Sequence, residues 1–317
     1  MKTPRSHKRT ALDPLLDAFL ADLRRRRGSP QTVAAYREAM RRFLRFMGEN
    51  GVERLQDVTP DDLAAYRCNI ADRLPSPASR YQYLRLIRRF FGWLESRQHI
   101  LISPAAALRL PKPGKKLGFV PSEEEMRRLL EQPDLSTPEG VRDRAFLEAA
   151  YSTGCRRSEM AAMDAPDLDL EEGTVLVRGK GGKERVVPLG RVAIQWLGRY
   201  LDDARPQLIH GGGRHRRKPV RDNEHVTALW IGTKGRRINP QIPPRFIGEY
   251  GRLSGIAAPV TPYALRRACA THMLRRGAHP VQIQMLLGHS SLRSLSQYLK
   301  TSITDLKRAH ERARPGQ

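Results

Sequence analysis

Two residues near the carboxyl end of the chain have side chains that could act on a phosphate. His289 directly follows the run Leu286-Leu287-Gly288, in which an apolar segment ends at a glycine, and Tyr298 comes soon after. An imidazole can donate a hydrogen bond to a phosphate oxygen, and a phenol held in place can attack phosphorus as a nucleophile. Many folds contain such a pair without using it, so its meaning depends on the residues upstream.

Further upstream, two cationic positions could bind the same phosphate. Arg156 and Arg157 follow Thr153-Gly154-Cys155, where the glycine permits a left-handed turn, so the sequence predicts a helix-to-helix corner that holds one of these two guanidinium groups. Lys180 lies in the glycine-rich segment 179–184, which joins two β-type runs and predicts a mobile hairpin turn. This turn lacks the GxxxxGK[ST] spacing of an ATP-binding P-loop.

A third cation, Arg266, lies in a segment that begins with the helix-start signal Thr261-Pro262. Tyr263 precedes Arg266 by three positions, so both side chains lie on one helix face, where the positive end of the helix would help them to bind an anion. The alternative is an exposed phenol beside an ordinary surface arginine.

The charge of the chain indicates the kind of partner. Its 317 residues include 57 lysines and arginines against 33 aspartates and glutamates, a formal net charge of +24. Such an excess attracts a polyanion, and nucleic acid fits because phosphate neutralisation releases counterions. A membrane surface is the rival polyanion, but no apolar run approaches the roughly 20 residues of a spanning helix. We therefore expect a soluble cytoplasmic, nucleoid-associated protein; charge that serves solubility alone is the alternative.

Cysteine and histidine positions do not indicate a metal site or a disulfide framework. Cys68, Cys155 and Cys269 are too far apart for a CxxC pair, and the spacing of Cys269 and His272 fits helix core packing better. His210 lies in a polar, basic stretch over 202–239 that predicts a solvated loop. We expect no metal and no cofactor.

Composition and periodicity divide the chain into a tail over 1–10, a helical domain over 11–107, a linker over 108–118 and a second domain over 119–317. Apolar residues recur at helical spacing over 12–23, 33–47 and 83–94, and Thr59-Pro60 starts a further helix. The second domain combines helices, among them one capped by Ser122, one over 142–151 and a basic one over 301–312, with the hairpin of 174–178 and 185–189.

Arginines cluster on the second and fourth helices of the first domain, where few carboxylates balance them. Ordinary solvated faces are the alternative, but the imbalance favours a surface that contacts DNA phosphates. The candidates are Arg37, Arg41, Arg42, Arg45, Arg80, Arg85, Arg88 and Arg89.

The order of these motifs resembles the tyrosine recombinase (phage integrase) family, in particular its Xer-like and transposon-encoded members. The resemblance covers nearly the whole chain and implies a mainly α fold with a small β-sheet: an N-terminal helical core-binding (SAM-like) domain and a C-terminal mixed α/β catalytic domain. It is carried by Thr153-Gly154-Cys155-Arg156-Arg157-Ser158-Glu159, by the run 179–189, by Thr261-Pro262-Tyr263-Ala264-Leu265-Arg266-Arg267, and by Leu287-Gly288-His289-Ser290 with Tyr298.

The resemblance also implies a role for each site residue. Tyr298 would be the nucleophile, Lys180 the general acid and His289 a further donor to the phosphate. Arg156 and Arg266 would clamp the phosphate, and Glu159 would orient the first of them. Tyr263 departs from the family pattern, because most members have histidine there; a neutral phenol is a poor base but can donate a hydrogen bond.

The function implied is cleavage and exchange of DNA strands through a covalent 3′-phosphotyrosyl intermediate, in DNA integration, excision or resolution. The resemblance further implies a tetramer on two double-stranded recombination sites, with or without a second recombinase. Two alternatives remain: a type IB topoisomerase or telomere resolvase with the same chemistry, and a catalytically silent DNA-binding protein.

Overall fold

The computed structural model describes residues 13–26, 30–111, 118–179, 182–211 and 227–288. The chain divides into two compact units, Met1–Lys116 and Leu117–Gln317. Their described parts are mainly helical with a small sheet, which confirms the predicted fold class. None of the helices in these ranges is long and apolar enough to cross a membrane.

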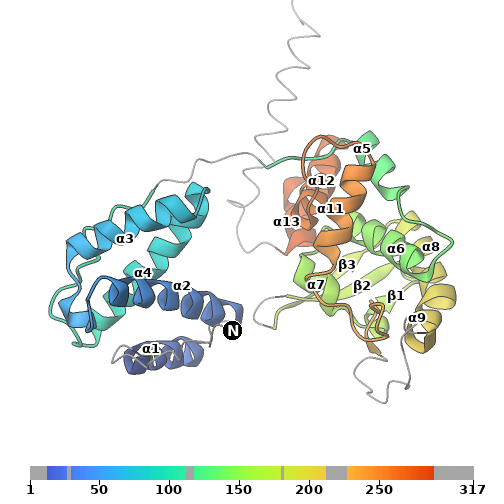
Figure 1. Ribbon diagram of the computed structural model, residues 1–317. Coiled ribbons are helices and arrows are strands. Elements are labelled where there is room, and N and C mark those ends of the chain that lie inside the picture. The colour runs from blue at the N-terminus through green and yellow to red at the C-terminus, as the bar shows by residue number, and fades with distance from the viewer. Residues whose placement is uncertain (1–12, 27–29, 112–117, 180–181, 212–226, 289–317) are drawn as a thin grey trace, which may run out of the picture. The chain divides into compact units, whose positions relative to one another are not determined.

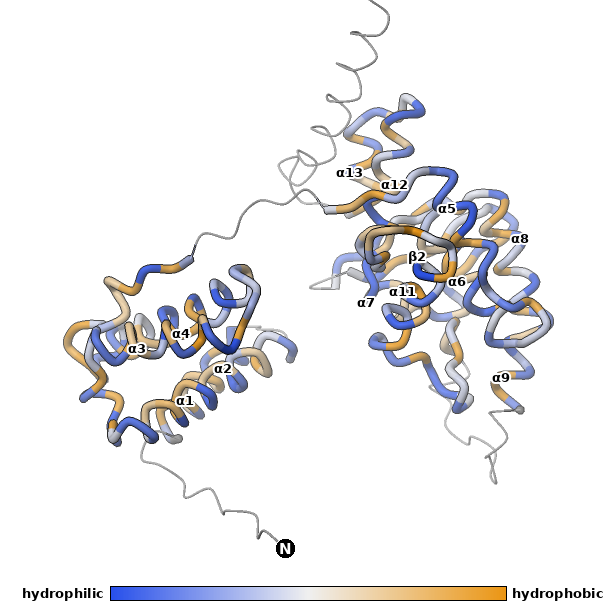
Figure 2. Tube along the Cα trace, turned by 45° about the horizontal axis from the view of Figure 1, so that its top comes forward, coloured by the Kyte–Doolittle hydropathy of each residue, from blue (hydrophilic) through white to orange (hydrophobic). Residues whose placement is uncertain are grey.

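Amphipathic helices form the first unit. Hydrophobic and hydrophilic residues interleave along α2 and α4, as Figure 2 shows, and their apolar faces pack around α1 and α3. Edge-to-face aromatic pairs fill the core; Phe19, for example, contacts both Tyr36 and Phe90 with ring centroids 5.1 Å apart. The helices are α1 (Asp13–Arg25), α2 (Pro30–Glu49), α3 (Pro60–Arg73) and α4 (Pro77–Ser96).

The second unit packs helices around a small antiparallel sheet. The described strands run in the order β1-β2-β3, and Val175 pairs with Val187 so that both side chains are buried on one face. Its elements are α5 (Glu123–Leu130), α6 (Pro138–Thr153), α7 (Arg157–Ala162), β1 (Leu168–Asp169), β2 (Thr174–Arg178), β3 (Glu184–Pro188), α8 (Arg191–Arg199), a π-helical segment (Tyr200–Ala204), α9 (Arg205–Gly211), α11 (Pro243–Leu253), α12 (Pro262–Arg275) and α13 (Pro280–Leu287).

Helix α6 is the central element of this unit. It is buried on nearly all sides and packs against α8, α12 and the π-helical segment, with α11, α12 and α13 grouped together beside it (Figure 1). A helix that is buried all round forms the core of its domain. The helix-to-helix corner at its C-terminus is therefore held from several directions.

Two local predictions were wrong in their bounds. The helix expected over 142–151 begins earlier, at Pro138, because the Thr137 hydroxyl accepts a hydrogen bond from Gly140 N at 3.1 Å and caps it. The loop expected around His210 is helical up to Gly211, because Leu208 is buried in the core and the Arg205 guanidinium donates to Ala228 O. Residues 212–226 of that stretch lie outside the described residues.

The prediction for Cys269 and His272 is confirmed. Both residues are buried on α12, and His272 Nδ1 lies 2.7 Å from the Tyr151 hydroxyl. Burial lowers the pKa of His272.

Candidate active site

The corner between α6 and α7 supplies the first arginine of the site. Helix α6 ends at Gly154 in the left-handed conformation, with φ +59°, and a Cβ there would lie 2.7 Å from Leu287 Cδ2. Arg156 then takes the N-cap position of α7, and the Glu159 carboxylate accepts its backbone N–H at 2.9 Å. The local sequence therefore fixes the backbone from which the Arg156 side chain extends.

Glu159 holds two guanidinium groups at once. Its Oε1 accepts from Arg156 Nη1 at 2.7 Å, and its Oε2 accepts from Arg185 Nη2 at 2.8 Å. The Glu159 side chain is 3% exposed, against 42% for Arg156. Burial raises the pKa of Glu159, but the hydrogen bonds from Arg185 and Arg156 outweigh burial, so its pKa lies below the ordinary value. The carboxylate is therefore charged at neutral pH and orients Arg156.

Helix α12 supplies the second arginine. Arg266 is 1% exposed, and its Nη1 and Nη2 donate to Gly154 O at 2.5 Å and to Leu287 O at 2.7 Å. The helix begins as predicted, since the Thr261 hydroxyl accepts from Ala264 N at 3.2 Å. Arg266 thus joins the end of α6 to the end of α13.

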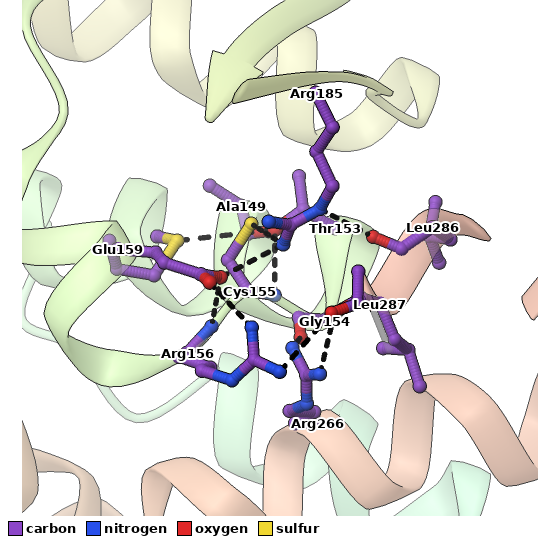
Figure 3. Close-up of polar contacts among 12 residues, drawn as sticks. Ala149, Thr153, Gly154, Cys155, Arg156, Glu159, Arg185, Arg266, Leu286 and Leu287 are labelled. Carbon is purple, nitrogen blue, oxygen red and sulfur yellow. Dashed lines mark hydrogen bonds and ion pairs between the residues drawn. The ribbon is translucent and has the colours of Figure 1, made fainter. Parts of the chain in front are cut away.

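The two arginines meet at the C-terminus of α13. Arg156 Nη2 lies 3.4 Å from Gly288 O, the carbonyl that follows the one bound by Arg266, and Figure 3 shows the two guanidinium groups next to each other. Gly288 caps α13 with φ +61°, and the chain continues from it into His289. The guanidinium groups of Arg156 and Arg266 therefore lie close together beside the residue that precedes His289. This arrangement fits the binding of one anion, such as a phosphate, by both guanidinium groups.

Three predicted site residues, Lys180, His289 and Tyr298, lie outside the described residues. The hairpin that carries Lys180 is described on both sides of it: β2 pairs with β3 up to Arg178 and Glu184. The structure therefore brings together Arg156, Arg266 and Glu159, and describes the residue before His289 and the strands that flank Lys180.

Tyr263 lies in the first turn of α12 and is 50% exposed. The Arg267 guanidinium lies over its ring, 4.9 Å from the centroid, and Arg267 Nη2 donates to Phe119 O at 2.8 Å. The ring is therefore held by a cation–π contact while the side chain remains accessible. This differs from Arg266, which shares the helix but is buried.

In the first unit, the predicted DNA-contacting arginines fall into three groups. Arg42 Nε donates to Glu38 Oε1 at 2.7 Å and Arg80 Nε donates to Leu74 O at 2.5 Å, so both make contacts within the protein. Arg37 is half-buried. The remaining candidates on α2 and α4 are exposed and therefore better placed to contact a partner: Arg41, Arg45, Arg85, Arg88 and Arg89.

Arg185 was not singled out from the sequence, although the structure places it at the centre of the site. Its guanidinium reaches Glu159 and also Leu286 O, at 3.0 Å from Nε. The available signal was an arginine next to the hairpin turn that carries Lys180. Alternation along a strand gives the face on which a side chain lies but does not identify distant partners.

Family models and known relatives match most of this chain. The model of the "Phage integrase family" matches residues 121–304, and that of the "Phage integrase, N-terminal SAM-like domain" matches residues 16–98. Tyrosine recombinase XerC 2 of Ralstonia nicotianae is 36% identical over 98% of this chain and 91% of that protein. Tyrosine recombinase XerD of Shewanella oneidensis is 34% identical over 96% of this chain and 97% of its own.

Solved structures give the same picture. The XerA recombinase matches with a TM-score of 0.52 and 26% identity over 96% of this chain and 99% of that chain. The XerH site-specific recombinase bound to a palindromic difH substrate matches with a TM-score of 0.70 and 19% identity, over 98% of this chain and 91% of that chain. This similarity shows a shared fold.

Proposed function

Because this chain belongs to the phage integrase family of tyrosine recombinases, we propose that Tyr298 cleaves DNA at a phosphate held by Arg156 and Arg266. The chain is a tyrosine site-specific recombinase that acts on DNA. The observation that supports this assignment of roles is the meeting of the two guanidinium groups at Leu287 O and Gly288 O, directly before His289.

The proposed reaction is a phosphoryl transfer that balances without a cofactor. The Tyr298 hydroxyl gives its proton to water as its oxygen bonds to phosphorus, while the bond from phosphorus to the 5′-oxygen breaks. Lys180 protonates the leaving 5′-oxygen, and His289 donates a hydrogen bond to a non-bridging oxygen. The 3′-phosphotyrosyl link retains the energy of the phosphodiester, so the strand can be rejoined to a new 5′-hydroxyl.

Two arginines suit this reaction because charge on the non-bridging oxygens must be stabilised in the transition state. Arg156 presents an exposed guanidinium that Glu159 holds in place. Arg266 is buried, and its guanidinium holds the end of α13 through Leu287 O. We assign Arg156 to direct contact with the phosphate. Arg266 belongs to the same phosphate clamp and also holds in place the backbone at the bottom of the phosphate site.

Tyr263 is proposed to donate a hydrogen bond from its hydroxyl, either to a phosphate oxygen or to Tyr298. Its exposure and the cation–π contact with Arg267 support this role, since the ring is fixed and the side chain remains accessible. The enzyme would then work without a strong base at this position. A slowed or regulated enzyme is the competing interpretation.

The active assembly is proposed to be a tetramer on two double-stranded sites in the cytoplasm, formed by this chain alone or with a second recombinase. Structures of lambda integrase, which has this fold, include a dimer bound to a COC′ core site and a tetramer bound to a Holliday junction. The exposed arginines of α2 and α4 would contribute phosphate contacts in that assembly.

Covalent trapping tests the proposed function. Sequencing the DNA in covalent adducts first identifies the site, and a nicked duplex of that site then lets the cleaved strand diffuse away. We expect the wild-type chain to accumulate a covalent protein–DNA adduct and Tyr298→Phe to form none while still binding the duplex. No adduct with the wild-type chain would contradict the proposal, and exchange of strands between two labelled duplexes separates a recombinase from a topoisomerase or resolvase.

A further inference from the structure

Arg185 connects three parts of the catalytic unit that are distant in sequence. It lies on β3; its Nη2 donates to Glu159 Oε2 at 2.8 Å on α7, and its Nε donates to Leu286 O at 3.0 Å on α13. Its side chain is 16% exposed. In Figure 3 the Arg185 side chain extends from the strand between Glu159 and Leu286. A guanidinium with such fixed partners holds its neighbours in a defined geometry.

Arg185 is one of the two arginines that bind the Glu159 carboxylate. Glu159 Oε1 accepts from Arg156 Nη1, and its Oε2 accepts from both Arg156 N and Arg185 Nη2. With Arg185 removed, a nearly buried carboxylate loses one of two cationic partners and gains freedom to rotate. Arg156, which the carboxylate orients, would then sample more positions.

The end of α13 also fits closely against Arg185. A Cβ at Gly288 would lie 2.9 Å from Arg185 Nη1 and 3.0 Å from its Cζ. The guanidinium therefore touches the backbone that leads into His289, while its strand directly follows the turn that contains Lys180.

We propose that Arg185 is a positioning residue for the reaction: through Glu159 it fixes Arg156, and through Leu286 O it fixes the end of α13 relative to that arginine. Arg185 does not touch the scissile phosphate. The inference rests on the proposed function, because it assumes that Arg156 binds this phosphate. It predicts a defect in transition-state stabilisation, not in DNA binding.

The test compares Arg185→Ala with a control, Arg178→Ala, on the nicked duplex. Arg178 is an arginine of the same hairpin whose partners are Asp167 and Glu184. We expect Arg185→Ala to slow single-turnover cleavage about 100-fold, since misplacement of a catalytic group by about 1 Å costs that much. Its Kd for the duplex should change less than about threefold, and Arg178→Ala should cleave like wild type.

A duplex with a neutral methylphosphonate at the scissile position separates positioning from general destabilisation. Without charge on the phosphate, the clamp contributes little, so the defect of Arg185→Ala should shrink to less than about tenfold. An equal defect on both duplexes would overturn the proposal. The proposal would also be overturned if a 5′-bridging sulfur, but not the methylphosphonate, restored cleavage by Arg185→Ala. Sulfur leaves without protonation, so this result would place the defect at Lys180.

Arg185→Lys keeps the test decisive if Arg185→Ala does not fold. A lysine retains the charge but cannot bind Glu159 and Leu286 O with a planar fork, so a folded Arg185→Lys should also lose cleavage on phosphate and recover on methylphosphonate. Wild-type cleavage by Arg185→Lys on phosphate would refute the positioning role. Failure of the proposed function is distinguishable, since the wild-type chain itself would then form no adduct.

Discussion

Gly288→Ala should destabilise the catalytic unit much more than an alanine at a comparable glycine. Gly288 has φ +61°, and its added Cβ would meet the Arg185 guanidinium at 2.9–3.0 Å. Gly255 in the same unit has φ +72°, and a Cβ there would meet nothing within 4 Å. Gly255→Ala is therefore a matched control that carries the backbone strain without the crowding.

The two substitutions share one energetic cost and differ in another. A non-glycine residue at positive φ costs about 1 kcal/mol, which applies to both. Crowding adds roughly 1–3 kcal/mol at Gly288, because Arg185 is fixed by Glu159 and Leu286 O and moves only if those hydrogen bonds lengthen. We expect about 1 kcal/mol for Gly255→Ala and about 2–4 kcal/mol for Gly288→Ala.

Urea unfolding followed by tryptophan fluorescence measures this difference. Trp196 and Trp230 lie in the catalytic unit, and a Trp93→Phe background removes the signal from the first unit. In an Arg185→Ala background, the cost of Gly288→Ala should fall to that of the control, because the crowded neighbour is gone. Equal costs for the two glycines, or a cost at Gly288 that Arg185→Ala leaves unchanged, would refute the reasoning.

Three further predictions concern the site and the DNA surface. The pKa of Glu159 is lowered in the folded chain, so the ionised carboxylate contributes stability above the ordinary pKa of 4.5, and this contribution is lost as the pH falls through the folded pKa. In urea unfolding, the stabilities of wild type and Glu159→Gln should therefore converge as the pH drops below 4.5. A difference in stability that stays constant with pH would contradict this prediction. Tyr263→Phe should slow adduct formation on the nicked duplex about tenfold or more, whereas Tyr263→His should retain activity; wild-type cleavage by the phenylalanine variant would show that the hydroxyl has no role. Replacing Arg41 or Arg88 by alanine should reduce the slope of log DNA affinity against log salt concentration by about 0.9 if each arginine contacts one phosphate. Fluorescence anisotropy measures this slope. Arg54 pairs with Asp57, so the control Arg54→Ala should leave the slope unchanged.

The sequence by itself determined the features that depend on neighbouring residues. Thr261 and Ser122 cap their helices through hydrogen bonds to residues three positions on, so the start of each helix follows from local chemistry. The left-handed turn at Gly154 and the position of Arg156 after it are local in the same sense. The order of such motifs along the chain was sufficient to indicate the family.

Only the tertiary structure decided which residues, distant in sequence, hold the side chains of the site in place. Arg266 is buried because Gly154 O and Leu287 O, from the ends of two other helices, accept its hydrogen bonds. Arg185 became part of the site because the fold brings Glu159 of α7 and Leu286 O of α13 within hydrogen-bond distance of its guanidinium. A guanidinium takes its partners from whatever carbonyls and carboxylates packing brings within about 3 Å, and no spacing in the sequence specifies that packing.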